Sequence, residues 1–239
     1  MLRLSFKVKP IKESWGDFEN IIPELISKYQ LKEICEIGAG ANPFLSDDLI
    51  QKEQLNYTLI DVDEEELNKG RNNLNRKVLD FSSQDFVPKD QYDLIFSKMT
   101  LEHIQYPEML HKNISSSLKK GGLAVHFFAT LYSIPSCVNL ILPEYLSNKI
   151  LFYIQQRDQD QHGKFPAYYR WTLGPIKKNV QRFESLGFQI ISYNGYVGHT
   201  YFPKQSLFGR MEAFYTKCLF KINSPYFSSN AIVVLMKNK

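Results

Sequence analysis

The sequence predicts an α/β fold in which helices flank a parallel sheet. Over the first two thirds of the chain, short apolar runs alternate with amphipathic segments, as strands alternate with crossover helices in such sheets. Gly38 and Gly40 directly follow the first apolar run, a pattern typical of the strand-to-helix turn in nucleotide-binding sheets. The length of 239 residues and the hydrophobic content of 44% suit one domain with a large core. We therefore expect a single domain over residues 1–239, with its cofactor-binding core in residues 30–130.

Each element of this core has its own signal. Residues 14–29 place apolar side chains at helical spacing and predict a leading helix. The first strand, residues 31–37, ends at the glycines. Asn42 and Pro43 predict the start of a helix, because asparagine is a favoured N-cap and proline is favoured at the first helical position. The same alternation predicts strands at residues 57–62, 77–80, 92–97 and 123–128, and helices at residues 64–74 and 107–118, the latter ended by Lys119-Lys120-Gly121-Gly122.

The alternation stops in the second half of the chain. Residues 131–172 are rich in Tyr, Phe, Gln and Pro and follow neither the strand nor the helix period, so we interpret them as an insertion. Regular structure resumes with predicted helices at residues 175–186 and 207–220 and predicted strands at residues 188–193 and 231–236.

The composition excludes several classes of protein. The net charge is +4, but Lys and Arg are spread along the chain, so no nucleic-acid-binding patch is predicted. The three cysteines are far apart and form no CxxC pair, so we expect a reducing, cytoplasmic location and no metal site. The uncharged run 121–143 is interrupted by Pro135 and by polar residues, which argues against a membrane span. The sequence leaves the oligomeric state open.

Acidic residues follow the first strands at the edge where parallel sheets bind ligands. Asp61 ends the second strand about twenty residues after the glycines, where a carboxylate can accept both ribose hydroxyls of a nucleoside. Asp80 follows the third strand and can accept a hydrogen bond from an adenine amine, and the ring of Phe81 can stack on the adenine. The spacing therefore predicts a nucleoside cofactor.

Two residues beside the glycines decide which cofactor is favoured. A dinucleotide site needs bare amide groups at a helix N-terminus to bind the pyrophosphate, but Pro43 has no N–H to offer. Glu36 instead places a carboxylate next to the turn, which suits a cationic cofactor that carries an amino group. S-adenosylmethionine is favoured on these grounds, and an NAD-dependent enzyme of similar topology is the alternative.

On these residues the sequence resembles the class I, Rossmann-like S-adenosylmethionine-dependent methyltransferases, in particular their small-molecule branch. The resemblance covers residues 31–130. Asn42 departs from it, because many relatives carry a third glycine there. Four segments carry the resemblance: Glu36-Ile37-Gly38-Ala39-Gly40-Ala41-Asn42, the ribose acid Asp61, Tyr92-Asp93-Leu94-Ile95-Phe96-Ser97 leading to Leu101-Glu102-His103-Ile104, and Leu118-Lys119-Lys120-Gly121-Gly122.

The resemblance implies a doubly wound sheet of seven strands, mostly parallel, with residues 231–236 as an antiparallel last strand. Helical insertions at 131–172 and 199–229 would then cap the substrate. It implies methyl transfer from S-adenosylmethionine to a small-molecule acceptor, such as a sugar, a glycan precursor or a natural-product intermediate. The implied cofactor-binding residues are Glu36, Gly38, Ala39, Gly40, Asn42, Asp61, Val62, Asp80, Phe81 and Ser97.

A hydroxyl or protonated amine acceptor must also lose a proton, for which a general base is expected. His103 is the first candidate because it follows the fourth strand, although a role in shaping the pocket is an alternative. His162 lies in a polar and aromatic stretch of the insertion that can line an acceptor pocket or pack as an ordinary cap. His111 is expected on a helix surface and His126 in a strand, and neither is given a role.

Two further alternatives are a nucleic-acid methyltransferase and a subunit without catalytic activity. Nucleic-acid amino-methyltransferases resemble one another in an Asn/Asp-Pro-Pro-aromatic segment after the fourth strand, where this chain has Ser97-Lys98-Met99-Thr100. A Pro-Cys pair for cytosine methylation is absent from that segment as well. The remaining alternative is a methyltransferase-like subunit that acts as a partner without catalysis.

Overall fold

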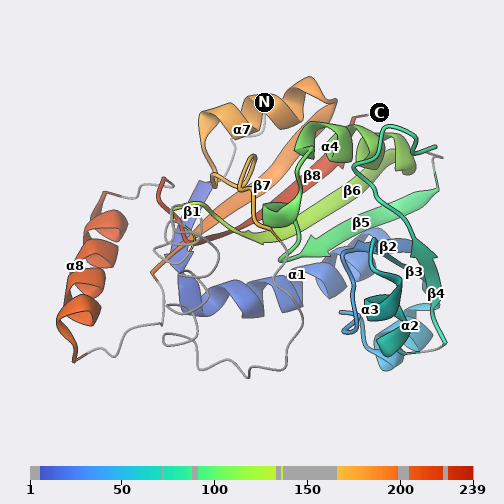
Figure 1. Ribbon diagram of the computed structural model, residues 1–239, viewed down its shortest axis with the longest axis horizontal. Coiled ribbons are helices and arrows are strands. Elements are labelled where there is room, and N and C mark those ends of the chain that lie inside the picture. The colour runs from blue at the N-terminus through green and yellow to red at the C-terminus, as the bar shows by residue number, and fades with distance from the viewer. Residues whose placement is uncertain are drawn as a thin grey trace.

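The computed structural model describes residues 6–71, 73–87, 91–132, 136, 166–198, 205–222 and 226–238. Within these residues eight strands form one sheet, and helices cover both of its faces (Figure 1). The strands are β1 (Phe6–Pro10), β2 (Glu33–Ile37), β3 (Asn56–Asp61), β4 (Asn75–Val78), β5 (Tyr92–Lys98), β6 (Leu118–Ala129), β7 (Phe188–Val197) and β8 (Asn230–Lys237). The helices are α1 (Ser14–Tyr29), α2 (Asp47–Glu53), α3 (Glu64–Lys69), α4 (Pro107–Ser117), α7 (Lys177–Ser185) and α8 (Leu207–Lys221), with 3-10 helices η1 (Ile11–Glu13) and η2 (Leu101–His103).

The strand order is β1-β7-β8-β6-β5-β2-β3-β4. β8 lies between β6 and β7 and runs antiparallel to both, whereas the other neighbouring pairs are parallel. The order turns back at β2, which lies between β3 and β5. Open α/β sheets bind their ligands beside such a reversal. The structure therefore confirms the predicted doubly wound, mostly parallel sheet with an antiparallel last strand.

The sheet has one strand more than the seven predicted. β1 pairs in parallel with β7, with Val8 opposite Gly195, and forms the edge of the sheet. Its sequence places Lys7 and Lys9 on either side of Val8, and charged side chains of this kind are common on edge strands. Phe6-Lys7-Val8-Lys9 does alternate at the period of a strand, but it lacks the continuous apolar run that marks most of the other strands.

Two hydrophobic layers hold the helices against the sheet. On one face α4 contributes Leu110 and Ile114, and α7 contributes Phe183, to a core that includes Tyr193 of β7. On the other face the core includes apolar residues of α1 and α3 together with Phe96, Val125 and their neighbours in the strands. Figure 1 shows α4 and α7 on one side of the sheet and α1, α2 and α3 on the other. The helices cover the two faces of the sheet, and the carboxyl ends of the parallel strands lie at the edge between the two helical layers.

The helix predicted to begin at Pro43 begins at Asp47 instead. Ser46 is its N-cap and accepts a backbone hydrogen bond from the first turn at 3.3 Å. The residues before it form a loop, because the buried Glu36 carboxylate accepts the N–H of Phe44 at 2.9 Å. A tertiary hydrogen bond thus overrides the local capping signal of Asn42 and Pro43.

Two further boundaries differ from the prediction. α3 ends at Lys69 and not at residue 74, because Gly70 adopts an extended conformation. The stretch 119–122, predicted to end a helix, lies inside β6, which pairs with β5 from Leu118 onward. The register between β5 and β6 shifts there, and Gly121 has a φ of +76°. These glycines therefore form an irregularity in a strand, as bulges do.

Candidate functional site

The turn after β2 is built on a backbone that requires glycine. Gly38 has a φ of +71°, and a Cβ placed on it would lie 2.5 Å from Thr100 Cγ2 and overlap the Thr100 hydroxyl. Its N–H donates to the carbonyl oxygen of Ile60 at 2.8 Å, which joins the turn to the end of β3. The side chain of Thr100, from the loop after β5, thus packs where a side chain at residue 38 would lie. The turn is fixed between two strands by this contact.

Gly40 and Asp61 meet at the centre of this edge. The N–H of Gly40 donates to Asp61 Oδ2 at 2.9 Å, while Asp61 Oδ1 accepts the N–H of Asp63 at 3.1 Å. The nearest atom to a Cβ placed on Gly40 would be the same Asp61 Oδ2, at 4.0 Å. Each carboxylate oxygen has two lone pairs, so Asp61 can accept hydroxyl groups in addition to these amides. The backbone and the carboxylate together form an open cradle.

Glu36 organises the loop beside the cradle. Its side chain is buried and accepts hydrogen bonds from the N–H of Phe44, at 2.9 Å, and from the hydroxyl of Tyr57. Burial raises the pKa of Glu36 to about 7, against the opposing effect of these two hydrogen bonds. The carboxylate is therefore directed at the protein's own loop, a contact that the motif alone does not predict.

Val62, Asp80 and Phe81, which were predicted to bind the cofactor, have different surroundings. Val62, directly after Asp61, is 59% exposed. Asp80 is exposed, and its Oδ1 accepts the N–H and the hydroxyl of Ser82, both at 2.7 Å. Phe81 is buried in the core, where its ring centre lies 4.4 Å from that of Phe86. Val62 is thus an accessible apolar surface beside the cradle, whereas the ring of Phe81 belongs to the core.

The remaining predicted cofactor residues differ in exposure. Ala39 is buried and donates its N–H to Ile60 at 3.4 Å, while Asn42 is exposed in the loop before α2. Ser97 is fully buried, and its hydroxyl contacts His126 Nδ1 at 2.8 Å. Ser97 therefore lies in the core beneath the predicted cofactor site and is not accessible at its surface.

His103 joins the segment after β5 to the end of the insertion. Its Nδ1 lies 3.0 Å from the carbonyl oxygen of Pro166. A carbonyl can only accept, so this nitrogen carries the proton and the lone pair of the neutral ring is on Nε2. The carbonyl oxygen of Glu102 accepts the N–H groups of Tyr168 and Tyr169 at 2.7 and 3.1 Å. Three contacts thus fasten residues 166–169 to η2, while His162 lies outside the described residues.

Glu102 is a candidate that the sequence argument did not single out. Its side chain is 3% exposed, and its carboxylate accepts the N–H of Ala129 at the end of β6. Burial raises the pKa of Glu102 to about 7. Its Oε2 has no hydrogen-bond partner among the described residues. The one available signal was an acid placed among apolar residues directly before His103.

His111, expected on a helix surface, is instead fully buried and packs against Trp171. Its Nδ1 donates to Pro107 O at 2.6 Å, and its ring stacks on Trp171 at 5.3 Å. The ring of His126 lies edge-on to it, also at 5.3 Å. Burial lowers the pKa of His111 to about 4 and that of His126 well below its usual value. Both imidazoles are therefore neutral core groups at pH 7.

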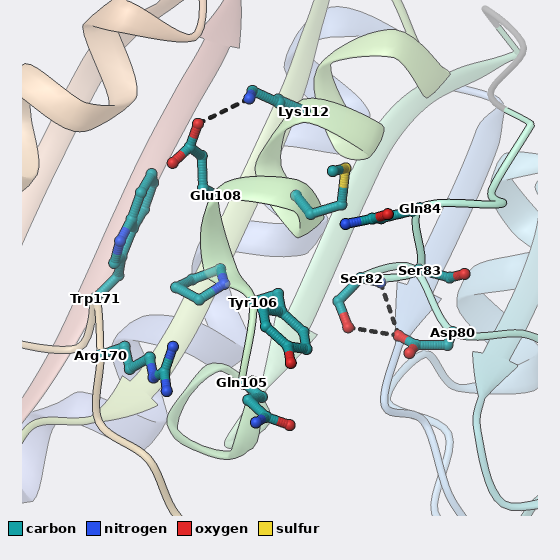
Figure 2. Close-up of a pocket in the computed structure, with 12 residues that line it drawn as sticks. Asp80, Ser82, Ser83, Gln84, Gln105, Tyr106, Glu108, Lys112, Arg170 and Trp171 are labelled. Atoms are coloured by element: carbon teal, nitrogen blue, oxygen red, sulfur yellow. Dashed lines mark hydrogen bonds and ion pairs between the residues drawn. The ribbon is translucent and has the colours of Figure 1, made fainter.

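A pocket of about 580 Å³ opens beside Asp80. Figure 2 shows it between the loop after β4, the first turn of α4 and the segment that carries Arg170 and Trp171. Asp80 is the one predicted cofactor residue that lines it. Its walls are mainly polar and aromatic: Asp80, Ser82, Ser83, Gln84, Gln105, Tyr106, Pro107, Glu108, Met109, Lys112, Arg170 and Trp171.

Trp171 has partners within the protein. His111 stacks on it, and the Arg182 guanidinium lies 5.1 Å from its ring centre. This favours ordinary packing for Trp171 over a platform on which a sugar stacks. Arg170 is exposed and lines the pocket (Figure 2).

Over the described ranges, no group of three or more His, Cys, Asp or Glu side chains is placed to hold a metal ion. In the same part of the chain, no helix combines the length and the apolar character that crossing a membrane requires.

Comparison with known proteins places this geometry in a family. A family model described as a methyltransferase domain matches residues 19–193. No curated protein matches the chain in sequence. Among solved structures, a SAM-dependent methyltransferase from Archaeoglobus fulgidus superposes with a TM-score of 0.52 at 15% identity, over 95% of this chain and 97% of that one.

Two other structures show the same likeness. A putative S-adenosylmethionine-dependent methyltransferase from Listeria monocytogenes has a TM-score of 0.54 at 12% identity, over 95% of this chain and 98% of that one. The [4+2]-cyclase SpnF also has a TM-score of 0.54, at 14% identity, over 94% of this chain and 84% of that one. At these identities the likeness shows the fold, and the family follows from the model that spans most of the chain. The chain therefore belongs to the methyltransferase domain family and has the Rossmann-like fold of S-adenosylmethionine-dependent methyltransferases.

Proposed function

We propose that this protein binds S-adenosylmethionine and transfers its methyl group to a small-molecule acceptor. The observation that carries the proposal is the pairing of Gly40 with Asp61, in which an open backbone lies against a carboxylate that retains lone pairs. A nucleoside presents two ribose hydroxyls, and such a carboxylate can accept both. The residues at this edge therefore fit the cofactor.

Different residues of the chain bind different parts of the cofactor. Asp61 accepts the ribose hydroxyls, Val62 provides apolar surface for the adenine, and Asp80 accepts from the adenine amine. Gly38 and Gly40 allow close approach of the backbone. When bound, S-adenosylmethionine supplies a methyl group on a positively charged sulfur. The protein's main contribution to the reaction is to hold the acceptor in line with that group, since alignment is worth about 7–11 kcal/mol in favourable cases.

Two groups near η2 can take the acceptor's proton. His103 offers the lone pair on Nε2, because Nδ1 donates to Pro166. Glu102 offers a carboxylate with a pKa of about 7, a value suited to a general base at neutral pH. We favour His103, because the Glu102 side chain is only 3% exposed and its carboxylate already binds the backbone of Ala129. The backbone carbonyl of Glu102 holds the end of the insertion. His162 stays a second proposal within the insertion.

The acceptor is proposed to be polar and rich in hydroxyl groups, such as a sugar or a natural-product intermediate. The pocket next to Asp80 offers amide, phenol and guanidinium groups from Gln105, Tyr106 and Arg170. These groups can hydrogen-bond hydroxyl and carboxylate oxygens of an acceptor. The pocket volume of about 580 Å³ is in the range of small-molecule sites, which supports a small molecule over an extended macromolecular substrate.

Calorimetric titration with S-adenosylhomocysteine tests the cofactor proposal. We expect saturable binding to the wild-type protein and its loss in Asp61→Ala. Asp48→Ala, which removes an exposed acid from α2, is the matched control and should bind like wild type. Absence of binding to the wild-type protein, together with binding of NADH, would favour the NAD-dependent alternative.

Cofactor binding alone does not establish methyl transfer, because the same fold occurs in a protein named as a [4+2]-cyclase. The second measurement is therefore incorporation of label from methyl-tritiated S-adenosylmethionine into a low-molecular-mass cell extract. We expect label in small molecules with the wild-type protein and none with Asp61→Ala. Binding without any incorporation, in this fraction or in protein and nucleic acid, would favour the non-catalytic partner subunit.

A further inference from the structure

Helix α8 exposes an apolar face that the methyl-transfer site does not use. Leu207, Met211, Phe214 and Ile222 are 71%, 59%, 71% and 67% exposed. Figure 1 shows α8 at the side of the molecule, beyond β1 and away from the helices that cover the sheet. These are large side chains, and their exposure is unusual in a structure whose other long helices bury their apolar faces.

The opposite face of α8 attaches it to the domain. Leu219 and Gly209 are buried, and a Cβ on Gly198 would lie 3.4 Å from Thr216 Oγ1 and 3.6 Å from Ile11 Cγ2. Ser206 caps the helix by accepting the N–H of Gly209 at 3.0 Å. α8 is thus a capped helix with one docked face and one exposed face.

The exposed apolar residues form a continuous stripe. Leu207, Met211, Phe214, Cys218 and Ile222 follow one another at intervals of four, three, four and four residues, which places them on one side of a helix. Cys218 is exposed as well. The stripe therefore runs along the whole length of α8.

Cations run beside this stripe. Arg210, Lys217 and Lys221 are exposed, and at 3.6 residues per turn they lie about a quarter turn to one side of it. Glu212 is the one acidic residue in the sequence of α8. The chain as a whole carries a net charge of +4. An apolar stripe with a basic border is the pattern of helices that lie in a lipid interface.

We propose that α8 binds the surface of a membrane that carries anionic headgroups. The apolar stripe inserts at the boundary between headgroups and acyl chains, and the three cations bind the headgroup phosphates and carboxylates. The helix remains parallel to the surface and does not span the bilayer. The proposal is independent of the methyl-transfer reaction, because it uses none of the residues of that site.

A second copy of the chain is a less suitable occupant of the stripe. If two copies of α8 packed antiparallel about a two-fold axis, their cation rows would lie on the same side of the contact. Six positive charges would then line one edge, where like charges destabilise the pair. An anionic surface instead complements all three cations at once.

Vesicle sedimentation tests the proposal with the full chain. We expect the protein to sediment with vesicles of phosphatidylcholine containing about 30% phosphatidylserine and to remain in solution with phosphatidylcholine alone, because each cation near an anionic surface is worth about fivefold in affinity. Added salt should weaken the binding, since it screens exposed charges. Equal binding to both vesicles, or binding to neither, would overturn the proposal.

Variants of the apolar stripe and of the three cations test whether α8 is the part of the protein that binds the vesicles. Met211→Glu with Phe214→Glu should reduce vesicle binding to the background level, and Arg210→Gln with Lys217→Gln and Lys221→Gln should reduce it roughly a hundredfold. Val87→Glu changes an exposed apolar residue in the loop after β4, and Lys28→Gln with Lys52→Gln and Lys120→Gln removes the same charge elsewhere. Both controls should bind like wild type.

Two control measurements separate membrane binding from unfolding and from dimerisation. Circular dichroism melting should show that each variant is folded as stably as wild type, because all the changed side chains are exposed. Light scattering coupled to gel filtration gives the mass in solution. A wild-type dimer that Phe214→Glu converts to a monomer, without vesicle binding, would assign the stripe to a second copy and refute the membrane proposal.

Discussion

The backbone N–H of Gly40 donates to the carboxylate of Asp61 at 2.9 Å, so the turn after β2 and the end of β3 share one hydrogen bond. The same carboxylate accepts the N–H of Asp63, which in turn caps α3. Asp61 therefore has a structural role in addition to the proposed contact with the ribose. A substitution that preserves one role and removes the other can separate them.

Asp61→Asn is expected to keep the fold and to weaken the cofactor site. The amide oxygen can still accept from Gly40, but the amide NH2 replaces the oxygen that accepts from Asp63, a loss of about 1 kcal/mol. The charge is also lost, and hydrogen bonds to charged groups are worth about 1.5–3 kcal/mol. Affinity for S-adenosylhomocysteine should therefore fall by roughly 10- to 150-fold, with a melting temperature lower by only about 2–4 °C. Calorimetry and thermal melting give the two quantities. A large drop in melting temperature with unchanged affinity would show that Asp61 is structural alone.

Gly38→Ala is expected to destabilise the protein through two effects. The positive φ costs a non-glycine residue about 1 kcal/mol or more, and the new methyl group would collide with Thr100. A loss of about 2 kcal/mol corresponds to a melting temperature lower by roughly 4–8 °C in a chain of this size. Gly16→Ala is the control: it lies in α1 with room for a Cβ and should stabilise by about 0.5–1 kcal/mol. Equal effects of the two substitutions would contradict the geometry of the turn.

Burial of His111 is expected to make the fold sensitive to acid. Its folded-state pKa is about 4, below the usual value near 6.5, so the unfolded chain binds the proton first as the pH falls. Stability is then complete above pH 6.5 and is lost between about pH 6.5 and 4, by about 3 kcal/mol. His111→Phe keeps an aromatic ring against Trp171 and should lessen this slope in urea denaturation at a series of pH values. An unchanged acid slope would argue against burial of the neutral imidazole.

The carboxylate of Glu102 is expected to have the opposite effect. Its pKa is raised to about 7 in the folded protein, so the contribution of Glu102 to stability is complete below about pH 4.5 and is lost as the pH rises to 7. Glu102→Gln cannot ionise, and its stability relative to wild type should increase over that interval by up to about 3 kcal/mol. Urea denaturation of both proteins at pH 4.5, 6 and 8 measures this difference. Glu184→Gln, on the exposed side of α7, controls for the loss of a negative charge, and a pH-independent difference for Glu102→Gln would contradict the assignment.

His103→Ala separates catalysis from cofactor binding. If Nε2 is the base, methyl incorporation should fall by roughly 10²- to 10⁴-fold, while affinity for S-adenosylhomocysteine changes less than twofold. The labelled-methyl assay and calorimetry measure the two quantities. If cofactor affinity falls in parallel with incorporation, the Pro166 contact is positioning the loop, and the proposal that His103 is the base is wrong.

Much of the fold could be predicted because its strongest signals are local. α1 has the predicted bounds, and β2, β3, β5, β6, β7 and β8 overlap their predicted positions, since each contains an apolar run. β4 (Asn75–Val78) is mostly exposed and lies two residues before the strand predicted at 77–80. β1 has the apolar-polar alternation of a strand but no such run, and it was not predicted. The start of α2 was misplaced because the buried hydrogen bond from Phe44 to Glu36 determines it, and no local signal reports a contact of this kind.

In the candidate site, too, some residues have a local sequence signal and others depend on tertiary contacts. The roles proposed for the glycines and Asp61 follow from backbone freedom and charge, so their motif indicates them directly. The burial of Phe81 and His111 depends on what packs over them, namely Phe86 in one case and Trp171 in the other. Glu102 is informative only once its surroundings are known, because a buried acid and a surface acid have the same letter in a sequence.

The position of β8 has a consequence for the order in which the sheet can assemble. β8 is late in the chain but lies between β6 and β7, and β1, the earliest strand, is joined to the sheet through β7. Deleting residues 230–237 would therefore divide the sheet into a pair, β1 with β7, and a group of five, instead of shortening an edge. During synthesis the first strand must remain unpaired with the main group until the last strand emerges, a long-range closure of the kind that slows folding. A ribosome-bound chain that stops before residue 230 is thus expected to be a substrate for chaperones.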